Sequence, residues 1–313
     1  MKKLICLALL LATVRLTQAQ TPQPSTLPNY LSYPAGTFTL PLHWKGDSLH
    51  QQWEPQASLL IPVSLPGCTR TLYMQFDTGS PYTLLYRQPL QAVHRLFPKT
   101  SYGKNLTDTL YQFGFKAGKL PLTAQKIAVI NHGDSIIAPN EPLIIGTIGT
   151  DLIDHKVVTL DYQHLQLTIS DSLPANWQAH QARAFHYAMR RILLPANLSG
   201  KQTILYFDSG SSAFPLLIDK ATCHQLAIDS TRQTSYPVQS WGRTLTAHTF
   251  DTRDSISLAG LRLPIRQVTW IEGANAGQAQ QMMRMGIGGM TGNKLLLHHR
   301  LVLDTRAKIF MVY

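Results

Sequence analysis

The sequence predicts an all-β protein made of two similar lobes, and three observations support this prediction. First, one short motif occurs twice, as Tyr73-Met-Gln-Phe-Asp77-Thr-Gly-Ser80 and as Ile204-Leu-Tyr-Phe-Asp208-Ser-Gly-Ser211. Second, the segments on either side of this motif are repeated as well. Third, the apolar runs are short and rich in branched and aromatic side chains, a composition that favours strands over helices.

The repeat extends well beyond the two aspartates, which are 208 − 77 = 131 residues apart. Upstream, Leu60–Gly67 is similar to Leu193–Gly200, and downstream Gly146–Asp161 is similar to Gly289–Asp304 at an offset of 289 − 146 = 143 residues. Repetition on this scale indicates a duplicated architecture. Each half is predicted to contain two strands, an aspartate turn, a variable stretch, a glycine-containing element, a short helix and a closing hairpin.

The first nineteen residues have the composition of a signal peptide. Lys2 and Lys3 precede an apolar stretch over Leu4–Val14, and Thr17-Gln-Ala19 offers small residues for cleavage before Gln20. The apolar stretch is short for a bilayer span. We therefore predict that residues 1–19 are cleaved and that the product is secreted or periplasmic; an uncleaved anchor is the alternative.

The remaining chain divides into three predicted parts. Residues 20–57 form a proline-rich lead-in with little fixed structure, apart from one extra strand over Phe38–Trp44. Residues 58–172 form the N-terminal β lobe, and residues 173–313 form a linker and the C-terminal β lobe. Cys68 and Cys223 occupy unrelated positions in the repeat, so the sequence leaves open whether they pair or remain two free thiols.

Two aspartates from equivalent turns predict a site with paired carboxylates. Like charges held close together cannot both ionise near neutral pH, so one carboxyl keeps a proton while the other acts as a base. Such a pair can carry out acid–base hydrolysis without a metal ion or cofactor, and we expect neither. Which aspartate holds the proton stays open at this point, because the pair titrates as a unit.

Other functional classes lack their motifs in this sequence. The formal net charge is +11, but the basic residues are scattered, so no nucleic-acid surface is expected. There is no His-Glu-x-x-His zinc motif and no Gly-x-Ser-x-Gly nucleophile turn. The glycines of Gly286–Gly292 lack the spacing of a dinucleotide-binding loop, and the repeat explains them better.

The two Asp-(Thr/Ser)-Gly-Ser turns and the two later glycine elements resemble those of pepsin-like aspartic proteases, with some retropepsin-like features. The resemblance covers about residues 58–313. It implies a bilobal acid-protease fold, in which two β-barrel lobes are related by a pseudo-twofold axis and an active-site cleft lies between them. It also implies an aspartic endopeptidase that acts on peptide or protein substrates as a monomer, with no membrane span.

Carried over to this sequence, the resemblance gives each motif residue a role. Asp77 and Asp208 would hold and activate the attacking water. Thr78 and Ser209 would lock the two turns together, and the glycines would let backbone N–H groups approach the carboxylates. The serines would donate hydrogen bonds to the outer carboxylate oxygens. These supporting residues are Thr78, Gly79, Ser80, Ser209, Gly210 and Ser211, and Thr147-Ile-Gly149 and Met290-Thr-Gly292 would pack beneath the turns.

One feature of the family, the flap tyrosine, is harder to locate. In the family, a tyrosine on a hairpin flap normally covers the cleft, often in a Tyr-Gly dipeptide. Tyr102, followed by Gly103, fits that dipeptide, with Tyr111 as the alternative.

A pepsin-like module that binds or inhibits without cutting is the alternative function. Such relatives usually lose an aspartate or a neighbouring hydroxyl, and here both sets are present, which favours the enzyme.

Overall fold

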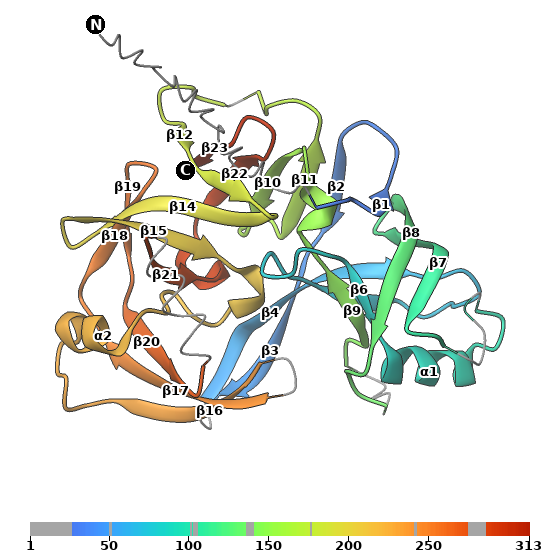
Figure 1. Cartoon of the computed structure of the whole chain (residues 1–313), viewed down its shortest axis with the longest axis horizontal. Coiled ribbons are helices and arrows are strands. Elements are labelled where there is room, and N and C mark those ends of the chain that lie inside the picture. Colours follow the sequence, from blue (N-terminus) through green and yellow to red (C-terminus); the bar gives the residue numbers. More distant parts are fainter. Residues whose placement is uncertain are drawn as a thin grey trace, which may run out of the picture.

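The structure is a computed structural model, and it describes residues 27–49, 52–100, 102, 106–135, 141–175, 177–240, 243–274 and 286–313. It confirms the all-β, two-lobed fold class (Figure 1). Within the described residues, no helix has the length and apolar character needed to cross a membrane. The predicted signal peptide, residues 1–19, and Gly103 lie outside the described residues.

The first lobe is built on an eight-stranded sheet in the order β1-β8-β6-β9-β5-β4-β3, with β7 paired to β4 and β8. Its most important strand is β5, whose side chains alternate between buried and half-buried positions and whose end delivers Asp77. Helix α1 (Arg87–Leu96) packs its apolar face on this sheet. The strands are β1 (Leu31–Ser32), β3 (His43–Leu49), β4 (Gln52–Ser64), β5 (Leu72–Phe76), β6 (Leu84–Tyr86), β7 (Thr109–Ala117), β8 (Leu120–Ile130) and β9 (Ile144–Ile148).

The second lobe consists of a six-stranded sheet and a three-stranded sheet, with the short helix α2 (Lys220–Leu226) against β20. Strand β15 leads into Asp208, as β5 leads into Asp77. The strands of the larger sheet are β13 (His186–Ala188), β14 (Arg191–Leu198), β15 (Lys201–Phe207), β18 (Ser255–Leu258), β19 (Leu261–Pro264) and β21 (Ile287–Thr291). Those of the smaller sheet are β16 (Thr234–Ser240), β17 (Arg243–Asp251) and β20 (Gln267–Glu272).

A fourth sheet joins the lobes, at the top of Figure 1, in the order β12-β23-β22-β10-β11-β2. The closing hairpins of the two repeats meet here, and Thr159 pairs with Val302, its own repeat counterpart. A local twofold axis therefore passes through this residue pair. The strands are β2 (Phe38–Pro41), β10 (Val157–Asp161), β11 (Gln166–Ser170), β12 (Arg183–Ala184), β22 (Arg300–Asp304) and β23 (Ile309–Val312).

The lobes are also tied together by their core and by one long hairpin. A single cluster of buried apolar side chains runs through both lobes. Strand β4 is antiparallel to β5, so its first half continues past the Asp77 turn towards the second lobe (Figure 1). There the carboxylate of Glu54 pairs with the ammonium group of Lys294.

Two expectations need adjustment, and one open question is answered. The predicted strand over 38–44 is two strands, β2 and β3, because the chain passes at Leu42 from pairing with β11 to pairing with β4 in another sheet. The lead-in has fixed structure from residue 27: β1 pairs with β8, and the Asn29 side chain donates to the Asp151 carbonyl. The thiols of Cys68 and Cys223 are both free.

Candidate active site

The two aspartate turns meet where the lobes join, and their backbones are held in the same way. The Asp77 N–H donates to the Ile148 carbonyl at 3.0 Å, and the Asp208 N–H donates to the Thr291 carbonyl at 2.9 Å. Strands β9 and β21 run parallel to β5 and β15, so each places a carbonyl beneath its aspartate. The two glycine elements thus lie directly beside the turns.

Thr78 and Ser209 exchange hydrogen bonds across the lobe interface. Each hydroxyl accepts the other residue's backbone N–H at 2.9 Å. The Thr78 hydroxyl donates to the Phe207 carbonyl at 2.9 Å, and the Ser209 hydroxyl donates to the Phe76 carbonyl at 2.8 Å. Both residues are buried. This symmetrical exchange, which we call the cross-lobe hydroxyl pair, fixes the distance between the two turns.

The glycines bring each backbone against the opposite carboxylate. A Cβ atom added to Gly79 would lie 2.6 Å from Asp208 Oδ1, and one added to Gly210 would lie 2.6 Å from Asp77 Oδ1. Each glycine N–H also donates to its own aspartate, at 2.8 Å for Gly79 and 2.9 Å for Gly210. Side chains larger than hydrogen at these positions would collide with the carboxylates.

The two carboxyl groups meet at the lobe interface, where each is packed against the glycine of the opposite turn. Asp77 is 7% exposed and Asp208 is half-buried. Burial, followed by the nearby charge of Asp208, raises the pKa of Asp77 well above its ordinary value. One proton shared between two such groups supplies an acid and a base at the same site.

The two serines that follow the glycines differ from each other. The Ser211 hydroxyl donates to Asp208 Oδ2 at 3.0 Å, in the arrangement expected from the sequence. The Ser80 hydroxyl donates instead to the Tyr82 carbonyl at 2.7 Å. The expectation that Ser80 bonds the Asp77 carboxylate is therefore wrong, because a carbonyl two residues along the turn is its acceptor.

Tyr102, the first flap candidate, does not lie over the pair. Tyr102 is buried in the core of the first lobe, where its ring packs near Phe113. It follows Lys99, whose carbonyl lies against Gly67 in the turn between β4 and β5, at the opposite end of β5 from Asp77. The flap assignment for Tyr102 is a mistake for this reason. Tyr111 is 72% exposed on β7, and its role stays a prediction.

Two residues that the sequence analysis did not single out stand beside the pair. Gln75 and Tyr206 each precede an aspartate by two residues, so they are equivalent in the repeat. The Gln75 amide donates to the Gly210 carbonyl at 3.4 Å, and the Tyr206 hydroxyl donates to the Gly79 carbonyl at 3.3 Å. The period of two along a strand would have placed them on the aspartate's side of the sheet.

A buried arginine from the second half of the chain holds the first turn from outside. Arg190 lies between β13 and β14, and its side chain is 2% exposed. Its guanidinium donates to the Asp154 carboxylate at 2.9 Å, to the Pro81 carbonyl at 3.1 Å and to the Leu27 carbonyl at 3.2 Å. The sequence showed only a pair of basic residues here, with no sign of burial.

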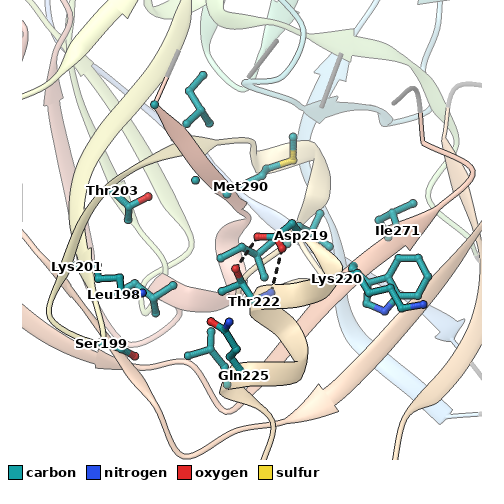
Figure 2. A pocket seen from close by; sticks show the side chains of 18 of the residues that line it. Leu198, Ser199, Lys201, Thr203, Asp219, Lys220, Thr222, Gln225, Ile271 and Met290 are labelled. Carbon is teal, nitrogen blue, oxygen red and sulfur yellow. Dashed lines mark hydrogen bonds between the residues drawn. The ribbon is translucent and has the colours of Figure 1, made fainter. Parts of the chain in front are cut away.

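Each lobe contains a cavity. The cavity of the second lobe, about 590 Å³, lies between α2, β15 and β21, and Figure 2 shows Met290 along its wall. Met290 reaches the pair through its sulfur, which accepts from the Ser211 hydroxyl at 3.5 Å. The cavity of the first lobe, about 360 Å³, is lined by Tyr82 and Thr83 directly after the Asp77 turn. Among the described residues, no cluster of His, Cys, Asp and Glu side chains could hold a metal ion.

Comparisons with known proteins add distant structural similarity. No family model matches the chain, and no curated protein matches it. Among solved structures, the crystal structure of an aspartic proteinase from Irpex lacteus is similar over 88% of this chain and 96% of its own, with 11% sequence identity and a TM-score of 0.48. A similarity this distant does not bear on the chemistry of the site.

Proposed function

We propose that the protein is a pepsin-like aspartic endopeptidase, which hydrolyses peptide bonds with a water molecule activated between Asp77 and Asp208. The observation that carries this proposal is the meeting of the two carboxyl groups at the lobe interface, each packed against the glycine of the opposite turn. The base would take a proton from the water, whose oxygen attacks the peptide carbonyl carbon. The acid would protonate the carbonyl oxygen, so no metal or covalent intermediate is needed.

The surroundings of the pair support the same chemistry. The cross-lobe hydroxyl pair holds the turns in register, which keeps the reacting groups in position before substrate binds. The cavities of the two lobes, with Tyr82 lining one and Met290 lining the other, would receive side chains of an extended peptide. The substrate would therefore be a peptide or an unfolded protein segment, and the site of action would be outside the cytoplasm if residues 1–19 are removed.

The proposal is tested by incubating the mature chain with a denatured protein between pH 3 and 8, with and without a pepstatin-type inhibitor. Cleavage is expected, and it should be lost with the inhibitor, in Asp77→Asn and in Asp208→Asn. Asp134→Asn, at an exposed aspartate of the first lobe, is the matched control and should cleave normally. Binding of the substrate without cleavage at any pH would instead support a silent binding module.

A further inference from the structure

The two aspartates have nearly identical sequences around them but do not receive the same hydrogen-bond donors. Asp208 accepts from the Gly210 N–H and from the Ser211 hydroxyl. The Asp77 carboxylate accepts from the Gly79 N–H, while the Ser80 N–H donates to the Asp77 main-chain carbonyl and the Ser80 hydroxyl donates to the Tyr82 carbonyl. A hydroxyl that donates to a carboxylate stabilises its charged form. The difference in donors therefore favours negative charge on Asp208.

The chain that follows each turn explains why the serines differ. In the first turn, the Ser80 carbonyl accepts from both the backbone and the hydroxyl of Thr150, and the Pro81 carbonyl accepts from Arg190. Two residues further on, Thr83 donates twice to the Asp151 carboxylate. These contacts hold residues 80–83 in a tight bend, and the Tyr82 carbonyl comes within reach of the Ser80 hydroxyl.

In the second turn the backbone takes a different course. Ser209–Ser211 form the 3-10 helix η2, and the Asp208 side chain accepts the Gly210 N–H at its start. The next hydroxyl, that of Ser212, donates to the Ser209 carbonyl and accepts from the Asn293 amide. The Ser211 hydroxyl thus remains directed at Asp208 Oδ2, with Met290 sulfur as its second neighbour.

Other groups near the pair do not reverse this bias. Tyr206 faces both aspartates, and its hydroxyl donates to the Gly79 carbonyl. Tyr86 lies on the Asp77 side, and its hydroxyl bonds that of Thr147. Gln75 is neutral, and the charge of Arg191 acts on the Tyr206 phenol.

We propose that the singly ionised pair carries its negative charge on Asp208, where Ser211 is the positioning residue, and its proton on Asp77. This rests on the proposed function for its catalytic meaning. Asp208 would take the proton of the attacking water, and Asp77 would give its proton to the oxygen of the peptide carbonyl, so the product of the step is a neutral gem-diol. The raised pKa of Asp77, caused by burial and then by the neighbouring Asp208, agrees in direction.

The first arm of the test needs no turnover. The chain is labelled with ¹³C at the aspartate carboxyls, the two signals are assigned with Asp77→Asn and Asp208→Asn, and both are titrated by NMR in the wild-type protein. The Asp208 signal is expected to show ionisation at the lower pH. Ionisation of Asp77 first would overturn the proposal. If this arm succeeds while no peptide is cleaved at any pH, the endopeptidase proposal fails and the charge assignment stands.

The second arm compares the two equivalent serines by the pH dependence of kcat/KM. Ser211→Ala removes a donor to the anion, so the acidic limb should move up by about one pH unit, and Ser211→Thr should restore it. Ser80→Ala, the matched control, should leave the position of that limb unchanged even where turnover falls. Equal movement in both alanine variants, or movement in Ser80→Ala alone, would contradict the role of Ser211.

Discussion

The two aspartate turns are copies of one motif, yet they are supported by different parts of the molecule. Below each aspartate the support is equivalent: a parallel strand supplies a carbonyl, and the cross-lobe hydroxyl pair joins the turns. Beyond each glycine the support diverges. The first turn is held by Arg190 and Asp151, and the second continues into η2.

This difference indicates which features a duplicated site keeps and which it can vary. The backbone contacts that set the separation of the carboxylates are shared, and a change in one would have to be matched in the other. The hydroxyls of Ser80 and Ser211, which influence where the negative charge lies, can differ between the two turns without a matching change. A pair with a fixed base and a fixed acid can therefore arise without moving the aspartates.

The largest loss of stability is expected when Arg190, which supports only the first turn, is replaced. Arg190→Met would leave the Asp154 carboxylate, whose side chain is 9% exposed, without its cation, and the Pro81 and Leu27 carbonyls without their donor. Breaking a buried ion pair from one side costs about 3–5 kcal/mol. Urea unfolding should show a loss of this size.

The control for this experiment is Arg232→Met, which removes an exposed partner of Asp229 and should cost less than about 1 kcal/mol. The double variant of Arg190→Met with Asp154→Asn should recover part of the loss, because no unpaired charge remains. Equal losses for Arg190→Met and Arg232→Met would show that the buried arginine is not what holds the first turn.

A smaller loss of stability, equal for the two turns, is expected when either member of the cross-lobe hydroxyl pair is replaced. Thr78→Val and Ser209→Ala each leave one buried N–H and one buried carbonyl unpaired across the interface. Unsatisfied buried groups of this kind suggest a loss of about 2–4 kcal/mol per variant. Thr39→Val, at an exposed threonine bonded to Thr168, should change stability by less than about 0.5 kcal/mol.

Urea unfolding of the three variants provides the measurement, and turnover should fall in the two interface variants alone. The result that matters is the comparison of Thr78→Val with Ser209→Ala. If one loss were several times the other, the geometrical symmetry of the cross-lobe hydroxyl pair would not extend to its energy.

The parts of the fold that the sequence predicted are those that the repeat makes visible. The two-lobed all-β class is confirmed, and the strands before each aspartate, the short helical turns after each glycine element and the closing hairpins lie where the repeat suggested. Helices α1 and α2 occupy equivalent places in the two lobes, since each follows a short extended segment that pairs in parallel with β8 or β20, but their sequences differ, so comparison of the halves did not reveal them.

The site was predictable in its residues but not in all of its contacts. The acceptor of a hydroxyl depends on which groups the fold places near it. The Ser80 hydroxyl donates to the Tyr82 carbonyl, which a bend of the chain brings close. Arg190 and Thr150, from distant segments, hold this bend through hydrogen bonds to the Pro81 and Ser80 carbonyls. The flap prediction for Tyr102 failed for a related reason. A Tyr-Gly dipeptide does not show which end of β5 its tyrosine packs near, and this tyrosine is buried in the core. The predicted boundaries of the lobes stay predictions.

The smallest effect concerns the charge of the pair itself. Because the pKa of Asp77 is raised in the folded protein, by burial and then by Asp208, the folded state keeps the proton longer than the unfolded chain does. This contribution to stability is fully present below the unfolded-state pKa of about 4 and is lost as pH rises through the folded value. Asp77→Asn cannot ionise, so it should be more stable than the wild type at neutral pH, with no such advantage at pH 3.

Thermal unfolding from pH 3 to 8 measures this difference, and Asp134→Asn should follow the wild-type curve because that aspartate is exposed. The comparison of the two turns becomes sharper with Asp208→Asn. That variant removes the neighbouring charge but leaves Asp77 buried, so a fall in stability with pH should remain, at reduced size. If Asp77→Asn instead ran parallel to the wild type at every pH, Asp77 would ionise as readily in the folded protein as in the unfolded chain, and a fixed acid in the first turn would be ruled out.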